Sequence, residues 1–389
     1  MKKSTATIDM SKPRQTVAIV GAGIGGLTAA LAFARNGAEV FVLEQASELK
    51  EIGAGIQITP NGARVLNALG LADDCAAESI VAQGVQPMDA ITGQPVTRFD
   101  LTTKSPAYRF FHRASLVTIL ADAAKKAGVH ISLGQRVCAV TADGTVVTDA
   151  GTLHADIVVG ADGIHSVTRD LFAGPKAEFT GQVAWRGVIV APDAPAVAHI
   201  WMAPKRHVVT YPIKGGLLNV VAVQERTDWA AEGWDHMDDP TNLQSAFSDC
   251  APNFQEILAQ VETPSLWGLF RHPVAQVWSK GRVVLLGDAA HPTLPFLAQG
   301  ANMAIEDAFV LAHCCAAHAS VQSAFRHYQQ LRRDRVIRAI SAANANAKNY
   351  HLSGLKRSVT FAGLKTLGAV APSAFINRLS WLYDYDVTR

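Results

Sequence analysis

The 389-residue sequence lacks the features on which nucleic-acid-binding, disulfide-bonded and zinc-binding proteins depend. Its 35 basic and 33 acidic residues leave a net charge of +2, and no basic stripe interleaves with aromatic residues, so we expect no nucleic-acid partner. Its five cysteines form no CxxC pair and no zinc-ligand spacing. We therefore expect reduced thiols, no metal site and a cytoplasmic location.

An uncharged run from Thr16 to Ala34 is the segment that resembles a signal peptide or a membrane span. Four glycines crowd between Gly21 and Gly26, which disfavours a spanning helix, and the run starts later than the apolar core of a signal normally does. The chain is 49% apolar and 17% charged, which is typical of a globular protein of about two domains. We expect no membrane partner.

A strand, a glycine-rich turn and a helix follow one another near the start of the chain. TVAIV (Thr16 to Val20) is a β-branched run of the kind found in strands buried on both faces. GAGIGG follows, and LTAALAFARNG then favours a helix that stops at Gly37. EVFVLE predicts a second strand that ends in Glu44. Together these segments predict a βαβ unit with the dinucleotide-binding fingerprint.

Each glycine of this fingerprint has a physical role. Gly21 permits the tight turn, Gly23 lets the backbone approach a pyrophosphate, and Gly26 lets the helix pack on the strand. Free N–H groups at the helix start would hold the phosphates, and Glu44 would accept hydrogen bonds from the ribose hydroxyls. The fingerprint alone leaves both FAD and NAD open as the ligand.

Two later motifs repeat one design, in which a buried strand ends in glycine and aspartate. Ile157 to Val159 precedes GADG with Asp162, and the strand in GRVVLLGDAAH precedes Asp288. Each carboxylate would lie at the C-terminal edge of a strand, where open α/β sheets bind their ligands and where an acid can bind a polyol hydroxyl. The alternative for either aspartate alone is a helix N-cap.

These motifs, GAGIGG with Glu44, GADGIHS and GDAAHPTLPFLAQGANMAIEDA, occur in the order that resembles the single-component FAD-dependent aromatic hydroxylases, over about residues 16–338. GAGIQITPNGARVLNALGL and AQGANMAIEDA resemble most the branch with salicylate hydroxylase, 3-hydroxybenzoate 6-hydroxylase and 6-hydroxynicotinate 3-monooxygenase. The resemblance implies an α/β fold. It would combine a Rossmann-like FAD-binding domain of the para-hydroxybenzoate hydroxylase type, an antiparallel β-sheet substrate domain and C-terminal helices.

The expected domain organisation is discontinuous. Short β segments such as QVAWRGVIVAP and LLNVVAVQE predict the substrate sheet, and FRHYQQLRRDRVIRAISAANANAKNY predicts a long helix. The arginines of that helix, Arg332, Arg333, Arg335 and Arg338, are expected to form a solvated or salt-bridged face. We expect a disordered tail (1–14), an FAD-binding domain (15–75, 100–180 and 275–310), a substrate domain (76–99 and 181–274) and a C-terminal helical region (311–389).

The resemblance also implies the cofactor contacts. Gly300, Ala301 and Asn302 would begin a helix whose N–H groups face the N1–C2=O edge of the flavin, where reduction places negative charge. The other contacts are Gly21, Gly23 and Gly25 at the pyrophosphate, Glu44 and Gln45 at the adenosine ribose, Arg113 at the pyrophosphate or the flavin chain, the backbone of Val137 at adenine, Asp288 at the ribityl chain, and Asp162 at the FAD site and the path of the reduced nicotinamide.

Alternation in HVVTYPI places His207, Val209 and Tyr211 on one face of a strand, either as a substrate-binding pair or as half-buried sheet residues. Related hydroxylases carry a His-x-x-x-Tyr pair here, which implies catalytic roles for His207 and Tyr211 in ionising a ring hydroxyl. The remaining expected pocket residues are Gln57, Phe296, Gln299 beside the flavin, and Trp185 with Arg186 at the pocket floor or the substrate carboxylate, with core packing as the favoured alternative for Trp185. We expect His291 to be structural or to lie beside the flavin.

The activity that the resemblance implies is that of an FAD-dependent monooxygenase. NADH or NADPH would reduce FAD, and O2 would add at the flavin C4a to give a hydroperoxide that hydroxylates a small aromatic acid. That acid would be salicylate, with loss of CO2, or another hydroxybenzoate, and the resemblance implies a homodimer. Gln57 and Phe296 stand where 6-hydroxynicotinate enzymes have histidines, which favours a hydroxybenzoate. A 6-hydroxynicotinate- or urate-type hydroxylase, an NAD-linked dehydrogenase and a non-hydroxylating flavoprotein are the alternatives.

Overall fold

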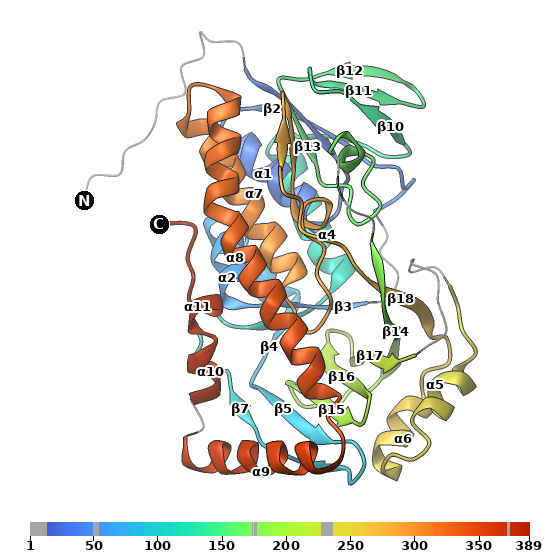
Figure 1. Cartoon of the computed structure of the whole chain (residues 1–389). Helices are drawn as coiled ribbons and strands as arrows, with labels where there is room; N and C mark the ends of the chain where they lie inside the picture. The colour runs from blue at the N-terminus through green and yellow to red at the C-terminus, as the bar shows by residue number, and fades with distance from the viewer. Residues whose placement is uncertain (1–13, 50–53, 173, 175–176, 227–235, 372–373) are drawn as a thin grey trace.

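The computed structural model describes residues 14–49, 54–172, 174, 177–226, 236–371 and 374–389. The expected disordered tail, residues 1–14, lies outside the described residues apart from Arg14. The described elements form a six-stranded sheet, an eight-stranded sheet, two three-stranded sheets and helices that cover them (Figure 1). This α/β architecture confirms the predicted fold class.

The six-stranded sheet carries the predicted βαβ unit. Its order is β19 (Ser279–Lys280), β20 (Val283–Leu285), β13 (Ile157–Gly160), β1 (Thr16–Val20), β2 (Glu39–Leu43) and β9 (His130–Ser132). All neighbouring pairs are parallel except β19 with β20. Helix α1 (Ile24–Arg35) connects β1 to β2, as the sequence predicts. The C-terminal ends of β1, β13 and β20 therefore meet at one edge, and each is followed by one of the three motifs.

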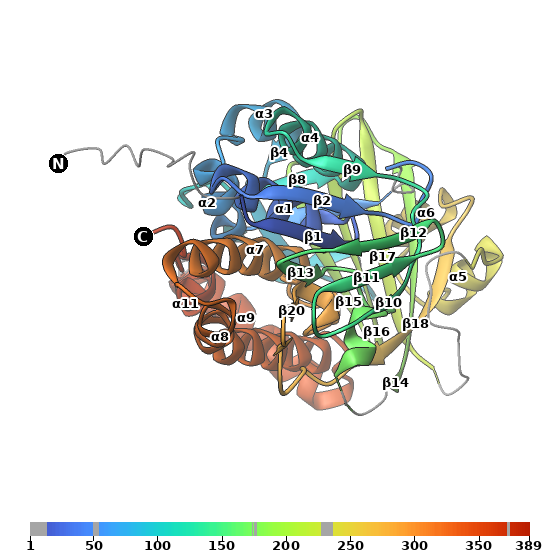
Figure 2. The same cartoon turned by 90° about the horizontal axis from the view of Figure 1, so that it is seen from above.

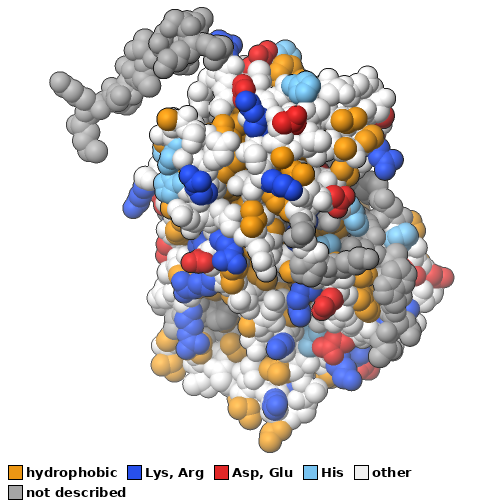
Figure 3. All heavy atoms as spheres, turned by 45° about the horizontal axis from the view of Figure 1, so that its top comes forward, with side chains coloured by type: hydrophobic (Ala, Val, Ile, Leu, Met, Phe, Trp, Pro, Cys, Tyr) orange, Lys and Arg blue, Asp and Glu red, His pale blue; other side chains and the backbone are white. Residues whose placement is uncertain are grey.

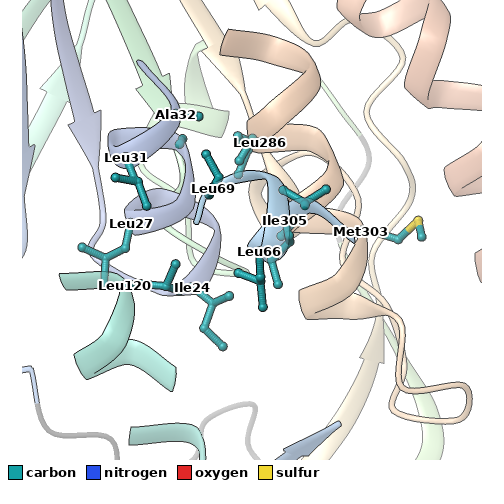
Figure 4. Close-up of a cluster of buried hydrophobic side chains, with 14 of the residues drawn as sticks. Ile24, Leu27, Leu31, Ala32, Leu66, Leu69, Leu120, Leu286, Met303 and Ile305 are labelled. Carbon is teal, nitrogen blue, oxygen red and sulfur yellow. The ribbon is translucent and has the colours of Figure 1, made fainter. Parts of the chain in front are cut away.

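Helices cover this sheet through a shared apolar core. They are α1, α2 (Pro60–Ala68), α3 (Ala72–Ala77), α4 (Arg113–Lys126) and α7 (Gly300–Ala317). Figure 4 shows Leu27 of α1, Leu66 of α2 and Leu120 of α4 in this core, close to Ile305 of α7, and all four side chains are buried. Burial of one such side chain contributes about 1.5–3 kcal/mol. The core fixes the helix starts that border the sheet edge.

Two three-stranded sheets flank the six-stranded sheet. One holds β10 (Val137–Val140), β11 (Thr145–Thr148) and β12 (Gly151–His154), and the other holds β3 (Gly55–Ile58), β8 (Arg109–His112) and β4 (Ser79–Val81). Strand β4 lies in the segment expected to belong to the substrate domain, yet it pairs with β8. The first part of that segment is therefore held by the sheet that includes β3.

The eight-stranded sheet holds the predicted substrate-domain strands. Its order is β18 (Ser265–Arg271), β14 (Glu178–Val190), β17 (Leu217–Glu225), β16 (Arg206–Ile213), β15 (Val197–Ala203), β5 (Gly84–Asp89) and β6 (Gln94–Pro95), with β7 (Phe99–Asp100) paired to β5. Its pairs are antiparallel except β15 with β5. Helices α5 (Pro240–Ala246) and α6 (Pro252–Ala259) pack on one face through Leu243, Phe247 and Phe254.

The first of the C-terminal helices packs along α7, and the group reaches the eight-stranded sheet. They are α8 (Val321–Tyr350), α9 (Gly354–Val370), α10 (Ala374–Arg378) and α11 (Ser380–Tyr383), and Figure 2 shows them on the side away from α5 and α6. Arg332 of α8 is fully buried and contacts Glu306 at 2.6 Å and Asp307 at 2.7 Å. Arg335 contacts Glu306 at 2.7 Å, so the salt-bridged alternative holds for both arginines.

The face of the molecule in Figure 3 carries Lys and Arg side chains among acidic and hydrophobic ones, with no continuous patch of one charge sign on its described part. This arrangement agrees with the near balance of charge in the sequence. Across the described ranges, every helix is too short or too polar to cross a bilayer.

Candidate active site

A cavity of about 340 Å³ lies where the motifs meet the eight-stranded sheet. Its walls come from the start of α1, the turn after β20, the start of α7 and one face of the sheet. Among the predicted residues, its lining includes Gly23, Gly25, Gln57, Arg113, Arg186, His207, Tyr211, Asp288, Gly300 and Ala301. Residues up to 278 positions apart in the sequence therefore border one space.

The glycine loop between β1 and α1 is tightly packed behind the cavity and open toward it. Gly21 has φ +100°, and a Cβ there would lie 2.6 Å from the Ala161 carbonyl oxygen. A Cβ on Gly26 would lie 2.0 Å from the Gly21 carbonyl oxygen, so helix and strand touch at this point. A Cβ on Gly23 would meet nothing within 4 Å. Gly23 thus leaves room for a ligand at the N-terminus of α1.

The two strand-end aspartates have different surroundings. Asp288, in the 3₁₀ turn η2 (Gly287–Ala289), borders the cavity and is accessible to solvent there. Protein still surrounds most of the carboxyl, and this desolvation raises its pKa. Asp162 instead accepts bonds from Ser166 Oγ at 2.5 Å and from the backbone N and Oγ1 of Thr168, both at 2.9 Å. Its side chain is bound within its own turn and does not line the cavity.

The start of α7 presents backbone donors to the cavity. The first bond along the helix runs from Met303 N to Gln299 O at 2.8 Å, so the N–H groups of Gly300, Ala301 and Asn302 precede it. The Asn302 side chain points elsewhere: it accepts from Thr59 N at 3.0 Å and donates to the Gln57 carbonyl at 3.0 Å. Asn302 therefore contributes its backbone N–H, while its amide ties α7 to β3 and α2.

Residues expected at the adenosine lie beyond the cavity lining. Glu44 follows β2 and accepts bonds from Ala22 N at 2.7 Å and Ala46 N at 2.9 Å, which also fixes the glycine loop. Gln45 is exposed, and Val137 is buried at the start of β10. Arg113 begins α4 and lines the cavity, with its backbone N bonded to Ala54 O at 2.8 Å. Arg113 thus lines the cavity, whereas Glu44 lies outside its lining.

One face of the eight-stranded sheet forms the floor of the cavity. Alternation along β16 places His207, Val209 and Tyr211 on this face, as predicted. Val209 pairs with Val221 of β17, which in turn pairs with Arg186 of β14. Arg186 therefore lies in the same row as Val209, two strands away.

His207 is a buried base within this floor. Its ring lies 5.6 Å from the Phe296 ring and 5.1 Å from the Tyr350 ring, and Nδ1 lies 2.8 Å from His351 Nε2. Burial lowers the pKa of His207 well below 6.5, and the nearby His351 lowers it further. The imidazole is therefore neutral at physiological pH and can accept a proton.

Tyr211 and Gln57 form the other end of the floor. Burial raises the pKa of Tyr211, although a hydrogen bond with Gln57 opposes part of that shift. Gln57 Oε1 also accepts from the Tyr108 hydroxyl at 2.6 Å. The Tyr211 ring packs 5.1 Å from the Phe110 ring. Tyr211 therefore remains a protonated phenol in a fixed position, able to donate a hydrogen bond.

Three residues expected to line the pocket lie outside the cavity lining. Trp185 occupies the opposite face of β14, where it packs with α5 and α6 and donates to Asp238 at 2.7 Å. Gln299 turns toward α2, where it donates to Thr59 Oγ1 at 3.1 Å and accepts from Asn61 at 3.2 Å. Phe296 is buried behind His207. Alternation explains Trp185, because its neighbour Arg186 takes the cavity face.

His291 is buried and contacts Asp307 at 2.5 Å, in agreement with a structural role. Although burial opposes it, contact with His291 and Arg332 holds the pKa of Asp307 below its usual range. Sequence reasoning missed His351, which reaches His207 across 144 positions. No local pattern marks it, since it is the residue that follows α8.

The cavity fits the FAD that the motifs imply. Gly23 leaves space at a helix N-terminus for a pyrophosphate, and the start of α7 supplies N–H donors for an electron-rich ring edge. Among the described residues, the Asp288 side chain has no hydrogen-bond partner, so it can accept from the hydroxyls of a polyol chain.

Comparisons with known proteins support the FAD site that the cavity indicates. Residues 14–343 match the family described as FAD binding domain. A 3-hydroxybenzoate 6-hydroxylase of Polaromonas naphthalenivorans is 35% identical, and the match covers 95% of this chain and 96% of that protein. A 3-amino-4-hydroxybenzoate 2-monooxygenase of Streptomyces platensis is 32% identical over 97% of this chain and 98% of its own. The chain belongs to the FAD-dependent aromatic hydroxylases.

Solved structures of two other proteins have the same fold as this aromatic hydroxylase. A salicylate hydroxylase substrate complex has a TM-score of 0.80 at 24% identity and covers 97% of both chains. The Klebsiella pneumoniae HpxO protein complexed with FAD and uric acid has a TM-score of 0.80 at 27% identity, over 94% of this chain and 95% of its own. FAD is therefore the cofactor of this hydroxylase, and NAD(P)H is the co-substrate typical of its family.

Proposed function

We propose that this aromatic hydroxylase acts on a small hydroxybenzoate, with NADH or NADPH as electron donor and O2 as the second substrate. The observation that carries the proposal is one apolar sheet face that presents His207, Tyr211 and Arg186 to the cavity. Relatives named for hydroxybenzoates support the substrate class. Bound FAD supplies the redox chemistry, which takes electrons from NAD(P)H and delivers one oxygen atom of O2 to the ring.

The positions of the three polar groups suit a small aromatic acid. His207 and Tyr211 are four residues apart on one strand, about 13 Å between Cα atoms, and Arg186 lies two strands, or about 10 Å, from Val209, which stands midway between them. A ring between them can direct its hydroxyl to the imidazole and its carboxylate to the guanidinium, since guanidinium groups bind carboxylates in a bidentate manner. Tyr211 then donates a further hydrogen bond to the substrate.

His207 accepts the proton of the ring hydroxyl at its Nε2, because Nδ1 is bonded to His351. A phenolate is more reactive than a phenol toward an electrophilic oxygen, so this proton transfer raises the rate of hydroxylation. Side chains of Val209, Val221, Val223, Trp267 and Leu269 line the same cavity and exclude water from the reacting ring.

The test replaces His207 by Ala in FAD-loaded protein and follows NADH oxidation, product and hydrogen peroxide. We expect FAD to remain bound, hydroxylation to fall by about 10²-fold or more, and peroxide per NADH to rise. His199→Ala on β15, outside the cavity lining, is the matched control and should retain coupled turnover. Unchanged coupled turnover in His207→Ala would show that His207 is not the base.

The substrate is identified by a panel of hydroxybenzoates, 6-hydroxynicotinate and urate, each followed by the mass of its product. Urate belongs in the panel because the HpxO structure contains uric acid. A product heavier by one oxygen atom indicates simple hydroxylation, whereas a product that has also lost CO2 indicates attack at the carboxylate-bearing carbon. If no aromatic compound accelerates NADH oxidation, the proposal fails and a non-hydroxylating flavoprotein remains.

We also propose a cytoplasmic homodimer, on the basis of the family resemblance and the sequence composition. Light scattering on the purified holoenzyme tests the assembly, and a monomeric mass would contradict it. Fractionation of the cells that produce the protein tests the location.

A further inference from the structure

His207 is the first member of a hydrogen-bonded chain that leaves the cavity. Its Nδ1 lies 2.8 Å from His351 Nε2, and His351 Nδ1 lies 2.8 Å from Glu225 Oε1. The two histidines are 1% and 7% exposed, whereas the Glu225 side chain is 41% exposed. The three side chains therefore connect the cavity wall at His207 to the protein surface at Glu225, and they come from β16, the residue after α8, and β17.

We propose that His351 and Glu225 relay the substrate proton from His207 to solvent, and this inference rests on the proposed role of His207 as the base. His351 and Glu225 are thus positioning residues, which act on the reaction through His207. Neither residue is part of the cavity lining itself.

The relay conserves protons at every step. The ring hydroxyl gives its proton to His207 Nε2 while His207 Nδ1–H passes its own to His351 Nε2. His351 Nδ1–H passes a proton to Glu225 Oε1, from which water removes it. Each imidazole accepts at one nitrogen and donates at the other, so no histidine has to remain charged. The relay returns to its first state when a proton moves along it in the opposite direction, from Glu225 to His207, and protonates the oxygen of the product.

Backbone contacts hold the three members in place. Lys205, in the turn before β16, has φ +62°; its N donates to His351 O at 3.1 Å, and its O accepts from Glu225 N at 2.9 Å. The same turn therefore binds both outer members of the relay. Strand pairing of His207 with Val223, two residues before Glu225, completes the arrangement. The positions of the three relay residues are therefore fixed by backbone contacts as well as by side-chain contacts.

Because His207 is buried, a proton that it accepts needs a path to solvent. Desolvation lowers the pKa of both histidines, although the contact with Glu225 opposes this for His351. A buried imidazole that takes a proton must therefore pass it on. Of its ring neighbours, Phe296 does not titrate, and burial raises the pKa of the Tyr350 phenol, which consequently stays protonated. His351 is the neighbour that can receive the proton.

The experiment uses FAD-loaded protein with the best hydroxybenzoate of the panel. Stopped-flow mixing in weak buffer with a pH-indicator dye follows proton release, while flavin absorbance reports substrate binding in the same mixture. We expect His351→Gln and Glu225→Gln to slow proton release by about tenfold or more relative to binding. We also expect a larger solvent deuterium isotope effect on kcat in both variants. Imidazole should restore part of the rate in His351→Ala.

Glu225→Gln keeps the variant set informative if the buried His351 variants fold poorly, because Glu225 is partly exposed. His199→Gln is the matched control and should release protons at the wild-type rate. Wild-type proton release and isotope effect in the folded relay variants overturn the relay, even if His207→Ala has abolished hydroxylation. Failure of the wild-type protein to hydroxylate any panel compound would instead overturn the proposed function.

Discussion

The start of α1 holds two glycines whose substitution should separate stability from cofactor binding. A Cβ on Gly26 would lie 2.0 Å from the Gly21 carbonyl oxygen, whereas ordinary contact begins at 3.4 Å. That oxygen belongs to a backbone turn with φ +100°, so the helix must move away by more than an ångström. Overpacking of this kind costs about 1–3 kcal/mol. In Gly26→Ala we expect the apoprotein to melt about 1–4 °C lower.

Gly23→Ala should have the opposite profile. Its φ of −70° suits alanine, and the new Cβ would meet nothing within 4 Å of the protein. The apoprotein should therefore melt within about 1 °C of wild type. The same Cβ would enter the space at the N-terminus of α1 that we assign to the pyrophosphate. Displacement of the phosphates should weaken FAD binding by about tenfold or more, which is about 1.4 kcal/mol.

The assay needs apoprotein of wild type and both variants. Calorimetry gives the melting temperature without FAD, and titration with FAD, followed by flavin fluorescence, gives the dissociation constant. Wild-type FAD affinity in Gly23→Ala would refute the placement of the pyrophosphate at the start of α1. A wild-type melting temperature in apo Gly26→Ala would refute the close packing of α1 on β1.

Three further predictions follow from buried charge and from the sheet face. Arg332→Met removes the buried charge that contacts both Glu306 and Asp307 and should lower the free energy of unfolding by about 3–5 kcal/mol in denaturant titrations, whereas the exposed Arg338→Met should cost under about 1 kcal/mol. Arg186→Gln should raise KM for a hydroxybenzoate by about tenfold with FAD affinity unchanged, and equal KM values would remove Arg186 as the carboxylate partner. Because burial lowers the folded-state pKa of His207 below 6.5, its contribution to stability is complete above that pH and is lost as pH falls. His207→Gln should therefore lose less stability than wild type between about pH 7 and pH 5, and equal losses would contradict this.

The elements that hold the cofactor could be predicted because their signals are local. A β-branched run, glycines at fixed spacing and an alanine-rich helix lie within Thr16 to Gly37, and their backbone requirements need no knowledge of the rest of the chain. The β-strand pattern of the substrate sheet is local as well. The fold class and the βαβ unit in the structure follow these predictions.

The orientation of pocket side chains could not be predicted in the same way. Alternation states that Trp185 and Arg186 lie on opposite faces of β14, but the face that meets the cavity depends on where α5 and α6 pack. Hydrogen bonds across 240 and 243 positions direct Gln299 and Asn302 toward Thr59, the residue before α2. His351 reaches His207 across 144 positions, and such distant contacts leave no periodic signal.

The two aspartate motifs show that part of the missing information was present in the sequence. Asp162 is followed by Ser166 and Thr168, and in the structure these hydroxyls occupy its carboxylate. Asp288 is followed by two alanines, and its carboxylate faces the cavity instead. A strand-end acid whose neighbours carry hydroxyls four to six residues later can satisfy itself by forming a local turn. Asp288 has a hydroxyl at a similar spacing, that of Thr293, but its carboxylate borders the cavity, and we expect the polyol chain of FAD to supply its donors. The hydroxyls after Asp162 therefore permit a capped turn, whereas Asp288 keeps its carboxylate open to the cavity.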